Sequence, residues 1–90
     1  MRPNQLILRR LPDVLAQYGK GRSALYEDIS QSLFPPPVKL GARAAAWPQH
    51  EVDAVLAARV AGRGEAELRA LVRGLVDQRQ TFPAAEAVGA

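Results

Sequence analysis

The sequence predicts a mostly α-helical domain with one small β-hairpin. Apolar residues recur every three or four positions in four segments, which is typical of amphipathic helices. Pairs of glycines at 19 and 21 and at 62 and 64, together with a proline run at 35–37, separate these segments. Ninety residues suffice for one small core, and the absence of cysteine excludes a disulfide framework.

The first helix is expected over 11–18, after an apolar run at 6–8 that predicts a brief strand or an extended lead-in. Pro12 is tolerated in a first helical turn, where its missing N–H costs no hydrogen bond. Gly19 is expected to end this helix. The apolar stripe consists of Leu11, Val14, Leu15 and Tyr18.

A second helix is predicted from about Arg22 to Gln31, with Leu25 and Ile29 four residues apart on one face. Two helices joined by about four residues that include glycine form a helix-turn-helix unit. The pattern also occurs in small helical domains of other kinds.

The proline run predicts an extended arm, with a ligand for an SH3-type partner as the alternative. Val38 and Leu40 alternate with Lys39, which predicts a strand with one buried face. A turn is expected at Gly41 and the next residue, followed by a returning strand from Arg43 to 47. Lys39 and Arg43 would then lie near the hairpin tip, as phosphate contacts or as incidental surface charges.

A third helix is predicted after Pro48, and a C-terminal amphipathic helix over 65–80. The domain organisation expected is a helix-turn-helix unit with its hairpin at 1–61, this helix at 65–80 and a disordered tail at 81–90. The C-terminal helix either covers the third helix or pairs with a second copy in a homodimer. Its apolar stripe is formed by Leu68, Leu71, Val72, Leu75 and Val76.

Positive charge is concentrated in the first half of the chain. Residues 1–47 contain seven Lys/Arg and three Asp/Glu, whereas residues 48–90 contain five and six. This asymmetry favours a surface that faces a polyanion, although ordinary solubilising charge is the alternative. The sequence has no apolar run long enough for a secretory signal or a membrane span, so a cytoplasmic location is expected.

The residues do not suggest an enzyme. His50 is the single histidine and has no cysteine or second histidine as a partner, so neither a catalytic group nor a metal site is predicted. Glu27 and Asp28 are adjacent and would point about 100° apart on a helix, so they do not form an acid–base pair. No cofactor is expected, because no glycine-rich phosphate loop follows a strand.

Double-stranded DNA is the partner that the residues favour. The N–H groups at the start of the second helix could bind a phosphate, and Arg22 and Tyr26 could reach phosphates or base edges. Glu27 could accept a hydrogen bond from cytosine, or simply weaken binding. The predicted DNA-binding residues are Gly21, Arg22, Ser23, Tyr26, Glu27, Lys39 and Arg43.

The segment from Arg10 to about Arg59 resembles the AlpA family of phage-type transcriptional regulators, which is similar to MerR-like and excisionase DNA-binding domains. The sequence departs from the family pattern at Gly21, Ala24 and Glu27. The resemblance is carried by Leu11-Pro12-Asp13-Val14, Gly19, Arg22-Ser23, Leu25-Tyr26, Ile29, Phe34-Pro35, Pro37-Val38-Lys39-Leu40-Gly41, Arg43, Trp47 and Glu51-Val52.

The resemblance implies a winged helix-turn-helix with an additional C-terminal helix. The recognition helix would be about 22–31 and the wing about 38–47, with Trp47 as a core anchor. The implied function is a sequence-specific DNA-binding regulator. One alternative is an excisionase-like factor that bends DNA, and another is a protein-binding domain that has kept the fold.

Overall fold

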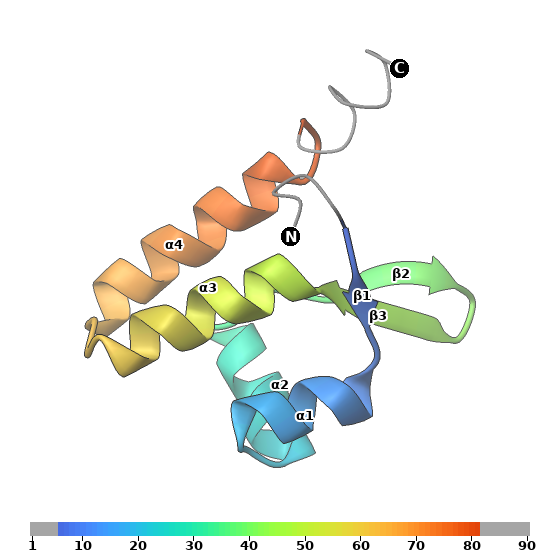
Figure 1. Ribbon diagram of the computed structural model, residues 1–90, viewed down its shortest axis with the longest axis horizontal. Helices are drawn as coiled ribbons and strands as arrows, with labels where there is room; N and C mark the ends of the chain where they lie inside the picture. The colour runs from blue at the N-terminus through green and yellow to red at the C-terminus, as the bar shows by residue number, and fades with distance from the viewer. Residues whose placement is uncertain (1–5, 82–90) are drawn as a thin grey trace.

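The computed structural model describes residues 6–81 (Figure 1). Four helices and a three-stranded antiparallel sheet make up this part, which confirms the predicted fold class and is compatible with a winged helix-turn-helix. Apart from Thr81, the predicted tail lies outside the described residues. The elements are β1 (Leu8–Arg9), α1 (Leu11–Tyr18), α2 (Arg22–Ser30), β2 (Val38–Gly41), β3 (Ala44–Pro48), α3 (Gln49–Val60) and α4 (Glu65–Gln78).

The turn between α1 and α2 depends on glycine. Gly19 adopts the left-handed conformation, with φ of 76°, and its N–H donates to the carbonyl of Leu15 at 2.9 Å. This closes α1 as predicted. Gly21 is the N-cap of α2, which ends at Ser30, one residue earlier than expected.

The sheet has the strand order β1-β3-β2, so the apolar lead-in contributes a short third strand to the predicted hairpin. Leu40 departs from the prediction, because it is 49% exposed and does not continue a buried face. The reason is a bulge: Lys39 pairs with Ala45 but Gly41 pairs with Ala44, which leaves Leu40 as the extra residue. The turn accordingly falls at 42–43, one residue later than predicted.

One hydrophobic cluster joins the helices to the sheet. Trp47 is almost fully buried, and its indole N–H donates to the carbonyl of Pro35 at 2.9 Å. The expected core anchor is therefore confirmed, and this bond fixes the proline arm against β3. The buried members of the cluster are Val14, Leu25, Phe34, Trp47, Val52, Val55, Val72 and Leu75.

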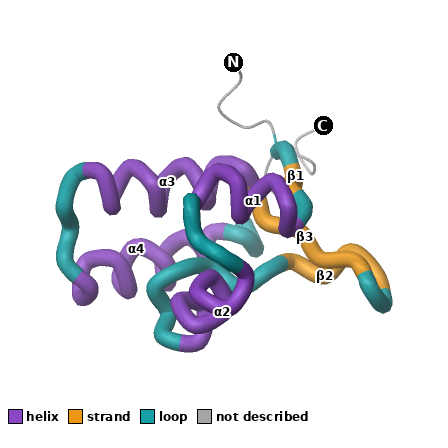
Figure 2. Tube along the Cα trace, turned by 90° about the horizontal axis from the view of Figure 1, so that it is seen from below, coloured by secondary structure: helices purple, strands orange, loops and turns teal. Residues whose placement is uncertain are grey.

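Helix α4 packs along α3, as Figures 1 and 2 show. Leu68, Val72 and Leu75 are buried within the protomer, so they are not available to a second copy without opening the core. Of the two sequence alternatives, covering α3 is therefore the arrangement observed. Arg69 of α4 also donates to the carbonyl of Gln31 at 2.9 Å, at the C-terminal end of α2.

We expect Gly74→Ala to raise the free energy of unfolding by about 0.5–1 kcal/mol, the difference in helix propensity between the two residues. Gly74 lies inside α4, and a Cβ added there meets no atom within 4 Å. Gly19→Ala is the matched opposite: it should destabilise by about 1 kcal/mol, because its φ of 76° suits glycine. Urea denaturation of both variants measures the two effects, and a loss of stability in Gly74→Ala would contradict the first.

Candidate nucleic-acid interface

Helix α2 has a buried face and an exposed face. Leu25 is fully buried, and Ile29 packs against the core, so these positions fix the orientation of the helix. The predicted contact residues all lie on the exposed face or at the uncapped N-terminus. They are Gly21, Arg22, Ser23, Tyr26 and Glu27.

Asp28 points inward, so its carboxylate does not add negative charge to the exposed face of α2. It is only 8% exposed, and its carboxylate accepts hydrogen bonds from the Tyr18 hydroxyl at 2.7 Å and from Lys20 Nζ at 2.8 Å. Arg59 of α3 lies 3.7 Å from the same oxygen and donates to the Tyr18 hydroxyl at 2.9 Å. The network joins α1, α2 and α3.

The network changes the pKa values of two of its members, Tyr18 and Asp28. Burial, followed by the hydrogen bond to Asp28, raises the pKa of Tyr18 to about 12, so this phenol stays protonated at neutral pH. Burial alone would raise the pKa of Asp28. The hydrogen bonds from Lys20 and Tyr18, with the charges of Lys20 and Arg59, outweigh burial and hold that pKa below its ordinary value. Asp28 is therefore a charged structural residue.

Glu27 remains on the surface. Its carboxylate accepts a hydrogen bond from the Gln31 side chain at 2.6 Å, one turn along the helix. It is the one carboxylate that α2 exposes, since Asp28 is turned inward.

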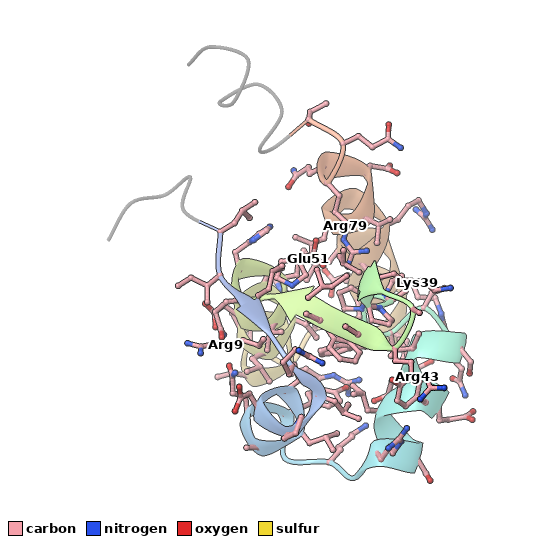
Figure 3. The ribbon with its side chains drawn as sticks, turned by 90° about the vertical axis from the view of Figure 1, so that its right-hand side faces the viewer. Arg9, Lys39, Arg43, Glu51 and Arg79 are labelled. Atoms are coloured by element: carbon pink, nitrogen blue, oxygen red, sulfur yellow. The ribbon has the colours of Figure 1, made fainter. Side chains whose placement is uncertain are left out.

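The β2–β3 hairpin projects beyond the helices in Figure 2. Lys39 and Arg43 are both exposed, Lys39 on β2 and Arg43 in the turn. Lys39 is directly paired with Ala45, and paired residues share one sheet face. In Figure 3 Lys39 and Arg43 lie along one side of the hairpin, and Arg9 lies on the other side.

The structure brings part of the predicted site together in one surface groove of about 380 Å³. Arg22 and Tyr26 of α2 line it, and so does Arg43 of the hairpin. Arg10, which precedes α1, also lines the groove and was missed by sequence reasoning. Its signal was the dibasic pair at 9–10, but sequence alone did not indicate that this pair would approach the hairpin.

The cations fall into two groups according to their partners. Some form ion pairs with carboxylates: Lys20, Arg59, Arg63, Arg69 and Arg79. Among residues 6–81, others have no carboxylate within ion-pair distance: Arg9, Arg10, Arg22, Lys39, Arg43 and Arg73. Five of these six precede residue 44, so the unneutralised charge lies mainly on the sheet and on the start of α2.

Other kinds of site have little support in the described part of the chain. His50 is half-buried in the first turn of α3. Within residues 6–81, no group of three or more His, Cys, Asp or Glu side chains could hold a metal ion. No helix in this range has the length and apolar character needed to cross a bilayer.

Comparison with known proteins gives two matches and one negative result. A family model described as "Prophage CP4-57 regulatory protein (AlpA)" matches residues 7–60. The uncharacterized protein ORF88 of Enterobacteria phage P4 is 46% identical over 54 residues, which cover 60% of this chain and 61% of that protein. The chain thus matches about three fifths of the length of this relative. No solved structure matches the chain.

Proposed function

The chain belongs to the AlpA family of phage regulatory proteins, which generally bind DNA, and from this premise we propose that it is a sequence-specific transcriptional regulator without catalytic activity. In this proposal α2 is the recognition helix, and the hairpin of β2 and β3 is the wing. Residues 1–61 form the DNA-binding unit, and α4 stabilises it. The observation that carries the proposal is the concentration of unneutralised cations around the start of α2 and along the hairpin.

The division of the cations matters because a polyanion competes with carboxylates for basic groups. A cation already paired within the protein must lose that pair before it contacts a phosphate, whereas an unpaired one exchanges only water and counterions. Arg22, Lys39 and Arg43 belong to the unpaired group and are exposed. They supply the salt-dependent part of DNA affinity, and they come from the two elements proposed to contact the duplex.

The start of α2 adds contacts that need no charged side chain. Gly21 provides no side-chain cap, so the first N–H groups of the helix are free to donate to a phosphate oxygen. Ser23 lies in this first turn and adds a hydroxyl donor. Glu27, one turn further along, is exposed and in a position to accept from the amino group of cytosine, which would contribute sequence preference.

A homodimer has weaker support. Three of the five apolar residues once expected at its interface are buried within the protomer, which leaves Leu71 and Val76 as half-buried contributors. The same burial weakens the alternative of a protein-binding domain that uses this stripe.

An architectural role in bending DNA uses the same contact residues as the proposed regulator, and the projecting hairpin suits it. A circular-permutation gel assay distinguishes bending of the bound duplex from simple occupancy.

We expect Arg22→Ala to weaken binding to a selected duplex about tenfold, because it removes a charge-assisted contact worth about 1.4 kcal/mol. The duplex is first selected from a random pool, and affinity is then measured at several salt concentrations. The matched control is Arg63→Ala, since Arg63 lies between α3 and α4 and pairs with Glu67. The proposal would be contradicted if the wild type bound no duplex at low salt, or if its affinity did not change with salt concentration.

A further inference from the structure

The groove at the start of α2 combines an apolar floor with a cationic rim. Arg10, Arg22 and Arg43 reach it from three separate segments of the chain. The remaining lining is apolar or aromatic and carries no carboxylate. It consists of Leu11, Pro12, Tyr26, Ala45 and Trp47.

The three arginines line the same groove without a carboxylate among its lining residues. Each of the three carries a positively charged guanidinium, which has N–H donors and no acceptor. Within residues 6–81, none of them has a carboxylate within ion-pair distance, whereas both cations of the nearby Asp28 network do. Their mutual repulsion in the free protein is relieved when an anion enters the groove.

The aromatic residues orient one of these cations. The Arg22 guanidinium lies over the Tyr26 ring, 5.9 Å from its centroid. Tyr26 in turn meets the buried Trp47 edge-on, with ring centroids 6.5 Å apart. Arg22 is therefore supported by a stack that ends in the core, and Tyr26 acts as a positioning residue.

We propose that this groove binds one phosphodiester of the DNA backbone, with Arg10 as a contact residue that the helix and the hairpin do not supply. The inference rests on the proposed function, because the groove lies between the two elements assigned to the duplex there. An arginine guanidinium can donate two parallel hydrogen bonds to phosphate oxygens. Three guanidinium groups that approach from different directions suit a tetrahedral anion. The apolar floor suits the adjoining deoxyribose, which a free inorganic anion lacks.

The test compares two neighbouring arginines. Arg10→Gln should weaken duplex binding about tenfold at low salt and reduce the slope of log affinity against log salt by about one. Arg9→Gln should leave both quantities unchanged, because Arg9 donates to Gln49 at 2.7 Å and lies on the strand at the opposite edge of the sheet from β2. Arg10 is exposed, and its side chain does not cap α1, so the substitution spares the fold.

Each outcome separates the inference from the function on which it rests. If the wild type binds DNA and Arg10→Gln binds equally well, or if both variants lose affinity equally, the phosphate site is wrong and DNA binding stands. If the wild type binds no duplex, both proposals fall. A duplex with a single neutral methylphosphonate, moved along each strand, should weaken the wild type wherever it replaces a contacted phosphate, and Arg10→Gln should be insensitive at one of these positions.

Inorganic phosphate alone distinguishes a backbone site from a free-anion site. We expect the amide signals of Arg10 and Tyr26 to shift only weakly and without saturation when millimolar phosphate is added to the free protein. Saturation at lower concentration would identify a free-anion site and overturn the assignment to the DNA backbone.

Discussion

Replacing Arg79 with Ala is expected to lower the free energy of unfolding by about 3 kcal/mol, because it leaves a buried carboxylate without its partner. Glu51 is fully buried, and Arg79 donates to both of its oxygens, at 2.8 and 2.6 Å. The same guanidinium donates to the carbonyl of Pro36 at 2.7 Å. Urea denaturation at neutral pH measures the loss.

Arg73→Ala is the control for this variant. Arg73 lies on α4, the helix for which Arg79 is the C-cap residue. It is exposed and has no ion-pair partner among residues 6–81, so its removal should change stability by less than about 0.5 kcal/mol. Replacing Glu51 and Arg79 together with Met should recover much of the loss, because no buried charge is then left alone. Equal stabilities for Arg79→Ala and Arg73→Ala would contradict the account of Glu51.

This ion pair links α4 to the proposed wing. Figure 3 shows Glu51 and Arg79 side by side next to the sheet. Glu51 lies in the first turn of α3, the helix that follows β3, and Pro36 precedes β2. One guanidinium therefore contacts the segments on both sides of the hairpin. Helix α4, which lies beyond the residues that match the family, thereby supports the base from which the hairpin projects.

The helices were predictable because each depends on local features of the sequence. The apolar spacing in α1 and α4 follows the helical period, and Gly19 ends α1 with the backbone conformation that glycine favours. The core role of Trp47 followed from the family resemblance and is confirmed by its burial. The hairpin was predicted, but its register was not. The alternation of Val38 and Leu40 gave no sign of a bulge, which arises from pairing with β3.

The remaining features depend on contacts between distant residues. Arg79 lies off the apolar stripe of α4, so the sequence alone suggests a solvated surface charge. Only the structure shows that its partner is Glu51, 28 residues earlier in the chain. Asp28 likewise reads as a surface acid, because only the folded chain brings Arg59 within reach of it. Arg10 enters the groove with Arg43 for the same reason. Periodicity identifies which face of a helix is apolar, but it does not identify the partner of a charge.

Asp28→Asn is expected to lower the free energy of unfolding by about 2 kcal/mol at neutral pH, since it removes the charge from two charge-assisted hydrogen bonds. The amide keeps the shape of the side chain, so the loss reports on charge and not on packing. Asp77→Asn is the matched control, because Asp77 is exposed near the end of α4. A control variant as unstable as Asp28→Asn would point to a general effect of net charge.

The pH dependence identifies the Asp28 carboxylate as the source of this stability. The pKa of Asp28 in the folded protein lies below its ordinary value of 3.8, despite burial, because Lys20 and Tyr18 donate hydrogen bonds to it. A carboxylate with a lowered pKa stabilises the fold fully above the pKa of the unfolded chain, and this contribution is lost as the pH falls through the folded pKa. The difference in stability between wild type and Asp28→Asn should therefore hold from pH 7 to about pH 5 and shrink below about pH 4. A difference that stays constant down to pH 3 would mean that the ionised carboxylate is not what joins α1, α2 and α3.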